Sequence, residues 1–152
     1  MADISGFGLV MTITASTTYP APVTLLNLAK DTDALAIADN VIGDAETGVN
    51  GEIISWSTNN PIEVTLSAIP DSLTDMALFN LWNANRPEFG KRGARDVITL
   101  TVIMPDGSTQ NFKSGKMTSG TPSPGVSGEG KMKTPTFKIL FQSIVRTPAI
   151  PV

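Results

Sequence analysis

The sequence DVITLTVIMPDGSTQNFKSGKM, residues 96–117, decides the fold of this 152-residue chain. Its first part, residues 96–104, is rich in β-branched and other apolar residues and is the strongest strand prediction in the chain. The tetrapeptide PDGS predicts a hairpin turn in which Gly107 supplies the positive φ. The returning stretch, residues 109–117, is polar and carries lysines, which predicts an edge strand or a solvated face. The whole segment predicts antiparallel pairing.

Segments on both sides of this hairpin show the patterns of short strands. Residues 9–17 and 62–68 alternate with a period of two. Pro20 and Pro22 are expected to break the first of these strands. Further β-like runs cover residues 23–28, 52–57 and 136–146, and residues 34–38 are small and apolar. About seven or eight strands joined by short turns predict a mainly β fold, an antiparallel β-sandwich or barrel with one flanking α-helix. The length suits one domain over residues 1–152.

Residues 72–85 change to a helical period, and Ser72 with Asp75 resembles a capping box at the start. One apolar stripe consists of Leu73, Met76, Ala77, Leu81 and Ala84. The side chains of Leu78, Phe79 and Trp82 lie outside this stripe. A helix that is apolar on more than one side is buried on more than one side. We therefore expect these three residues to pack against a neighbouring subunit, the alternative being a groove of the same domain.

Charge is distributed unevenly along the chain. Residues 1–85 hold one cation and ten acids, a net charge of −9, whereas residues 86–152 hold ten cations and four acids, a net charge of +6. Residues 39–51 are acidic and predict a long loop or an extended hairpin arm, and residues 86–95 predict a basic loop. If the two halves form different surfaces, copies of the chain meet acidic face to basic face. If the halves interleave in one fold, the asymmetry disappears.

The residue content excludes most catalytic chemistry. The chain has no cysteine and no histidine, which removes thiolates, the commonest general base and the commonest transition-metal ligand. Residues 125–131 match a phosphate-binding loop, but Met132 replaces the hydroxyl residue that binds magnesium and no helical pattern follows. Asp31 and Asp33 have the spacing that begins a calcium loop, but no further ligand falls in register. We expect no enzyme activity, no cofactor and no metal.

The order of the elements resembles that of the tail tube proteins of contractile-tailed, myovirus-type bacteriophages. The phrases that carry the resemblance are ISGFGL at 4–9, AKDTDAL at 29–35, GVNGEIISWSTNNPIEVTLSAIP at 48–70, NANRP at 83–87, ARDVITLTVIMPDGS at 94–108 and TFKILFQS at 136–143. The resemblance implies a virion protein, assembled in the bacterial host cytoplasm, whose hexameric rings stack into the inner tail tube, a conduit for DNA ejection. Sheath protein would lie outside the tube, and tape-measure protein and then DNA, contacted without sequence specificity, would lie in the lumen.

No catalytic residue is implied, and the candidate sites are contacts between copies. The acidic arm with its flanking aspartates and the basic loop are the candidates for ring stacking, and the helix is the candidate for packing within a ring. The stacking residues are Asp31, Asp33, Asp44, Glu46, Arg86, Lys91, Arg92 and Arg95. No apolar run approaches the length of a membrane span, so no membrane anchor is expected. The alternatives are another ring-forming tail component, the tube of a phage-derived injection system, or a ligand- or carbohydrate-binding β-sandwich.

Overall fold

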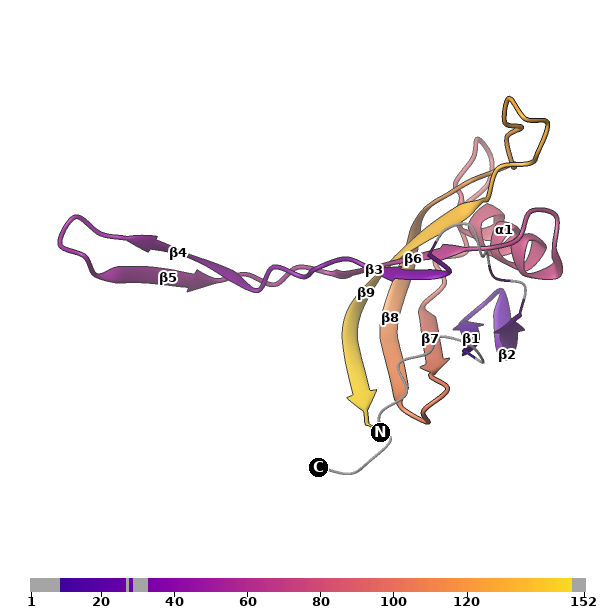
Figure 1. Cartoon of the computed structure of the whole chain (residues 1–152). Helices are drawn as coiled ribbons and strands as arrows, with labels where there is room; N and C mark the ends of the chain where they lie inside the picture. Colours follow the sequence, from indigo (N-terminus) through magenta and orange to yellow (C-terminus); the bar gives the residue numbers. More distant parts are fainter. Residues whose placement is uncertain (1–8, 27, 29–32, 149–152) are drawn as a thin grey trace.

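One antiparallel sheet of seven strands forms the body of the protein (Figure 1). The structure is a computed structural model and describes residues 9–26, 28 and 33–148. In chain order the described elements are β1 (Val10–Ala15), β2 (Tyr19–Leu25), β3 (Leu35–Ile37), β4 (Gly43–Thr47), β5 (Ile53–Ser57), β6 (Ile62–Ser67), α1 (Leu73–Asn85), β7 (Ile98–Ile103), β8 (Thr109–Gly120) and β9 (Thr136–Thr147). The strand order is β2-β1-β7-β8-β9-β6-β3, and each pairing is antiparallel. The predicted mainly β, antiparallel fold with one flanking helix is confirmed.

The sheet curls until its two ends meet. Leu28, three residues beyond β2, forms an antiparallel bridge with Ala68, the residue after β6. Since β2 lies at one edge of the sheet and β6 lies next to the other edge, this bridge closes the curl. The strands β4 and β5 pair only with each other and form no second layer over the sheet. The curled sheet, joined by this bridge, is the barrel-like form of the expected fold.

The hairpin of β7 and β8 forms as predicted, but its second strand does not lie at an edge. Gly107 has a φ of 93° in the connecting turn. Between β7 and β9, β8 occupies the middle of the strand order, so of the two alternatives expected, an edge strand or a solvated face, the solvated face is the one observed. Its polar residues belong to that face: Phe112 and Met117 are buried, whereas Lys113 and Lys116 lie on the opposite, exposed face of the strand.

The two prolines near the start of the chain lie inside a strand and do not end one. The chain reverses at residues 16–18, and Pro20 and Pro22 both belong to β2. Strand β2 pairs with β1 on one side and lies at the end of the strand order. Because proline has no N–H to donate, an edge strand is where a sheet tolerates it. The expected break is thus corrected, since the turn comes before the prolines.

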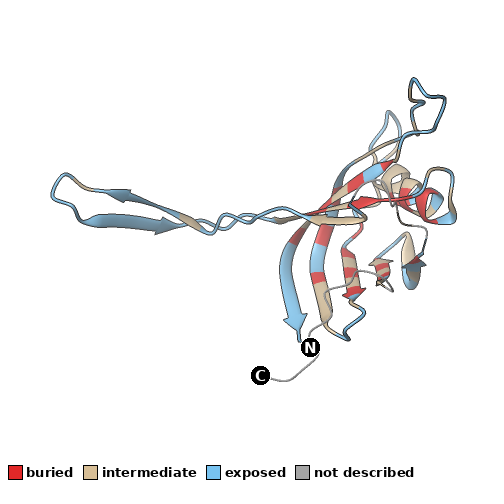
Figure 2. Ribbon diagram, in the orientation of Figure 1, coloured by how far each residue is buried: buried red, intermediate tan, exposed pale blue. Residues whose placement is uncertain are grey.

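The core lies between the sheet and α1 (Figure 2). Its largest fully buried side chains come from six strands and the helix: Phe112, Phe137, Phe141, Met11, Ile13, Leu25, Leu66, Leu78, Leu81, Ile98, Leu100 and Ile139. The rings of Phe112 and Phe141 contact each other with centroids 5.3 Å apart. Burial of this apolar surface is the main favourable contribution to folding.

Helix α1 begins as the sequence predicts, and its buried face coincides only in part with the predicted stripe, of which Leu81 is fully buried. The Ser72 hydroxyl accepts a hydrogen bond from the Asp75 N–H at 3.2 Å, and the Asp75 carboxylate accepts one from the Asp71 N–H at 2.9 Å. Leu78 is only 1% exposed, whereas Leu73 of the predicted stripe is 85% exposed. The predicted stripe therefore includes exposed residues, and Leu78, expected to contact a neighbouring subunit, belongs to the core of its own chain.

Candidate assembly interface

A two-stranded arm projects from the edge of the barrel (Figure 1). Gly51, with a φ of 87°, lies in its turn, where the Gly48 N–H donates to the Glu52 carbonyl at 2.7 Å. At the stem, Asn60 Nδ2 donates to the Val41 carbonyl at 2.8 Å. With about ten residues a side at about 3.3 Å each, the arm reaches about 30 Å from the sheet. The hairpin-arm alternative for residues 39–51 is the one observed, and the arm continues along β5 to its stem.

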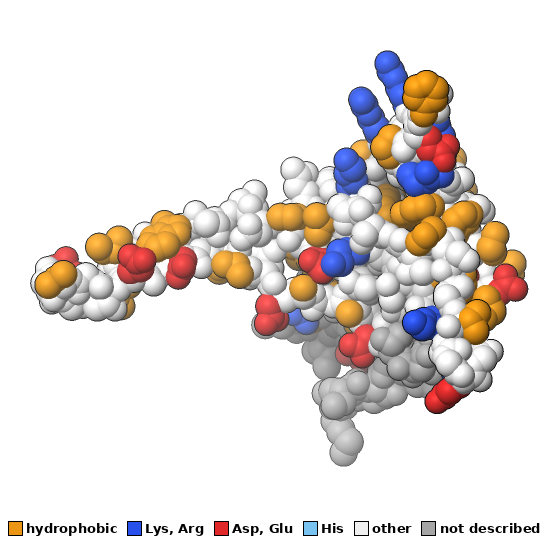
Figure 3. Space-filling model, turned by 90° about the horizontal axis from the view of Figure 1, so that it is seen from above, with side chains coloured by type: hydrophobic (Ala, Val, Ile, Leu, Met, Phe, Trp, Pro, Cys, Tyr) orange, Lys and Arg blue, Asp and Glu red, His pale blue; other side chains and the backbone are white. Residues whose placement is uncertain are grey.

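Cross-strand pairing gives the arm two different faces. Asp44 pairs with Trp56 and Glu46 pairs with Ile54. Because side chains alternate along a strand and paired residues share a face, these four side chains lie together on one face. Figure 3 shows acidic and hydrophobic side chains next to each other along the arm. Residues 31–85 contain no lysine or arginine, so no cation of the arm balances these acids.

The arm exposes more apolar surface than a free hairpin in water is expected to show. Trp56 is 44% exposed, Ile54 is 59% exposed and Ile42 is 77% exposed. Figure 2 shows the arm as almost entirely exposed, in contrast to the strands of the barrel. An isolated two-stranded hairpin is marginally stable, and clustered exposed apolar residues mark interaction surfaces. The arm is therefore the strongest candidate for a surface that another chain covers.

Two cations of the predicted basic loop, Arg86 and Lys91, make contacts within their own chain. Arg86 lies over the ring of Trp82 at 5.2 Å from its centroid and pairs with Glu88. Lys91 Nζ donates to the backbone carbonyl of Asn83 at 2.7 Å. Both cations thus lie at the carboxyl end of α1, where positive charge is stabilising. These two residues are occupied within their own chain, which the sequence pattern alone did not reveal.

The remaining predicted contact residues are mostly free for a partner. Arg92 and Arg95 are exposed, as are Asp33, Asp44 and Glu46. In the part of the chain that the structure describes, no ion pair joins the arm to the basic loop. Asp31 lies outside the described residues. The rings of Phe79 and Trp82 have centroids 5.8 Å apart and are partly buried against the core, and their role between subunits stays a prediction.

Asp96, which follows the basic loop, links the turn before β2, the end of α1 and the segment before β7 through hydrogen bonds. Its carboxylate accepts hydrogen bonds from the N–H groups of Thr17 at 2.7 Å and Thr18 at 3.0 Å, and from the Thr18 hydroxyl. Asn85 Nδ2 also donates to it at 2.9 Å, and Asn85 Oδ1 accepts from the Asp96 N–H at 2.9 Å. Burial raises the pKa of Asp96, but the hydrogen bonds outweigh it and hold the pKa below its ordinary value.

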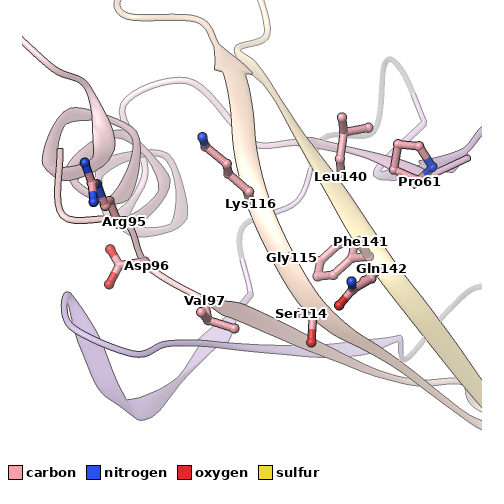
Figure 4. A pocket seen from close by; sticks show the side chains of 10 residues that line it. All are labelled: Pro61, Arg95, Asp96, Val97, Ser114, Gly115, Lys116, Leu140, Phe141 and Gln142. Atoms are coloured by element: carbon pink, nitrogen blue, oxygen red, sulfur yellow. The ribbon is translucent and has the colours of Figure 1, made fainter.

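A groove of about 660 Å³ opens beside Asp96, across β8 and β9 (Figure 4). Arg95 and Lys116 line it on one side, and Val97 and Leu140 supply apolar surface. The Asp96 carboxylate in its wall is already engaged in the hydrogen bonds described above, which leaves the two cations as the free charges of the groove. The groove therefore combines positive charge with apolar surface.

The phosphate motif of the sequence does not form a phosphate-binding loop in the described residues. No group of histidine, cysteine, aspartate or glutamate side chains there has the arrangement of a metal site. The segment that matches a phosphate-binding loop forms a turn in which Val126 bridges to Met132, and strand β9 follows it. No helix within the described ranges has the length and apolar character needed to cross a membrane.

Solved structures with the same fold come from contractile injection systems. The chain is similar to a chain of the anti-feeding prophage baseplate, with a TM-score of 0.61, 8% identity and 98% coverage of each chain. It is similar to the cap that terminates the tube of the same particle, with a TM-score of 0.61, 13% identity and coverage of 97% of this chain and 92% of that chain. A chain of the PVC sheath–tube complex in its extended state gives a TM-score of 0.60 at 12% identity, covering 95% of this chain and 91% of that chain. At these identities the likeness concerns the fold.

Sequence comparison then supplies the family. Residues 2–145 match the family described as tail fiber protein gp32, and the chain belongs to that family. No curated protein matches the chain in sequence. Family and fold together identify a structural, phage-tail-like protein, a broader class than the tail tube that the sequence phrases resemble.

Proposed function

We propose that this chain is the subunit of the inner tube of a contractile tail. Six copies form a ring, and rings stack into a conduit through which phage DNA is ejected. Sheath protein surrounds the tube, and tape-measure protein and then DNA occupy the lumen. The observation that carries the proposal is the projecting arm, because its apolar residues are exposed among the described residues and such a surface needs a partner.

Two further observations support assembly into a tube. A chain from the PVC sheath–tube complex has the same fold over nearly its whole length. The chain is acidic overall, with a pI of about 4.8. Negative charge facing a lumen prevents the counterion-releasing contacts that hold basic proteins on DNA, so DNA slides.

The experiment is electron microscopy of the purified protein over a range of concentrations, and of tail-like particles from the source. The proposal predicts stacked rings or hollow tubes with six-fold symmetry in projection. A particle that stays monomeric at every concentration and is missing from the tube in tail-like particles would contradict it.

A second candidate follows from the family description, which names a tail fiber protein. A third follows from the likeness to a tube-terminating cap and a baseplate chain. The same micrographs separate these roles. A fiber component forms thin filaments without a lumen, a cap or baseplate component forms single rings that do not stack, and a tube subunit forms stacks.

A further inference from the structure

We infer that the groove beside Arg95 and Lys116 is the acceptor for the arm of a second copy of this chain. The inference rests on the proposed function, since it names the partner surface of the arm. The face of the arm that docks is the one that carries Asp44, Glu46 and Trp56.

Two residues that line the groove have an unusual backbone conformation. In the described residues three non-glycine residues have positive φ, and two of them, Arg95 at 54° and Ser114 at 57°, line this groove. Backbone of this kind clusters at functional sites. In Figure 4 Arg95 belongs to the segment that leads into β7, and Lys116 belongs to β8. Neither cation has an ion pair among the described residues.

The arm matches the groove in charge and in hydrophobicity. The docking face offers two carboxylates next to Trp56 and Ile54, and the groove offers two cations next to apolar walls from Val97 and β9. Complementary charge of this kind fixes the register of a contact, and a large aromatic side chain supplies affinity when it enters an apolar depression.

Each chain donates one arm and offers one groove, so the contact is head to tail. A contact between two different surfaces closes into a ring or continues as a filament, depending on the rotation it imposes. Docking of arm into groove therefore produces an assembly without a second type of subunit.

A charge exchange tests the pairing. The arm variant carries Asp44→Lys and Glu46→Lys, and the groove variant carries Arg95→Glu and Lys116→Glu. Each variant alone meets like charge at the contact, so the concentration needed for assembly should rise at least about tenfold. In an equimolar mixture each arm finds a groove of opposite charge, so the mixture should assemble at the concentration that suffices for the unaltered chain. Light scattering and electron microscopy provide the readout.

A matched control separates the groove from net charge. The variant with Lys113→Glu and Arg146→Glu has the same charge change on exposed residues outside the groove, and it should assemble like the unaltered chain. Circular dichroism and thermal unfolding check that each variant is folded before it is mixed. If the folded groove variant assembles normally, if the control is equally impaired, or if the mixture does not recover, the inference is wrong and the proposed function stands. If the unaltered chain never assembles, the proposed function fails first.

Discussion

Removal of the Asp96 carboxylate should destabilise the barrel more than removal of any other charged side chain among the described residues. The carboxylate accepts four hydrogen bonds that link the turn before β2, the end of α1 and the start of β7. A hydrogen bond to a charged group contributes about 1.5–3 kcal/mol, and a buried donor left unpaired costs about 1–3 kcal/mol. Because bonds within one network are not additive, we expect Asp96→Ala to lower the free energy of unfolding by about 3–5 kcal/mol.

Lowering the pH should reduce the stabilisation that the Asp96 carboxylate provides. The pKa of Asp96 in the folded chain lies below its ordinary value of 3.8, because its hydrogen bonds outweigh the effect of burial. The carboxylate therefore stabilises the fold above about pH 4 and loses this contribution as the pH falls through the folded-state pKa. Asp96→Asn cannot titrate, so the acid side of its stability profile should be flatter than that of the unaltered chain.

Thermal unfolding followed by circular dichroism measures both effects. For a chain of this size about 2–4 °C corresponds to 1 kcal/mol, so Asp96→Ala should lower the Tm by about 6–20 °C at neutral pH. Asp39→Asn is the matched control, because Asp39 is exposed, and it should change stability by less than about 0.5 kcal/mol. A folded Asp96→Ala variant whose Tm lies within about 2 °C of that of the unaltered chain would refute the reasoning.

Three further substitutions test other parts of the structure. Gly115→Ala places a Cβ at 2.4 Å from a phenylalanine ring of β9 and should destabilise the fold by about 1–3 kcal/mol in urea unfolding, whereas Gly128→Ala meets no atom within 4 Å and should be near neutral. Tyr19→Phe removes the 2.8 Å hydrogen bond to the Ala77 carbonyl and should cost about 0.5–1.5 kcal/mol. Burial raises the pKa of Tyr19 despite an opposing side-chain hydrogen bond, so this tyrosine stabilises the fold below about pH 10 and less above it. Trp56→Ala should leave the Tm nearly unchanged but weaken assembly by at least about 30-fold in sedimentation, and normal assembly would count against the arm as the interface.

The strands were predictable because their pattern is local. A period of two over residues 62–68 and the turn at Gly107 follow from side-chain alternation and from backbone conformation, and both were observed. The position of β8 was not predictable in this way. Its exposed lysines look the same on an edge strand and on one exposed face of a central strand, and only the long-range pairing of β8 with β7 and β9 separates the two.

The helix and the contact residues show a second limit. An apolar residue at the surface of an assembly and one in the core have the same hydropathy, so the sequence could not assign Leu73 to the exposed face and Leu78 to the core. Charge had a similar ambiguity. Arg86 and Lys91 belong to the same basic loop as Arg95, but they stabilise the end of α1 in their own chain. Lys116 lines the same groove as Arg95. Because Lys116 is distant from the basic loop in sequence, no sequence pattern predicted that the two residues lie close together.

The two prolines of β2 have a consequence for the time before assembly. Before an assembly of the proposed kind forms, copies of the chain are together in solution, and an unprotected strand edge would let them associate irreversibly. Pro20 and Pro22 remove two potential N–H donors from the outermost strand, so this edge is a poor template for another chain. The arm contains no proline between Gly43 and Ser57, so it keeps its full set of backbone donors. The β2 edge is thus poorly suited to pairing with another chain, whereas the arm keeps the backbone donors that such pairing needs.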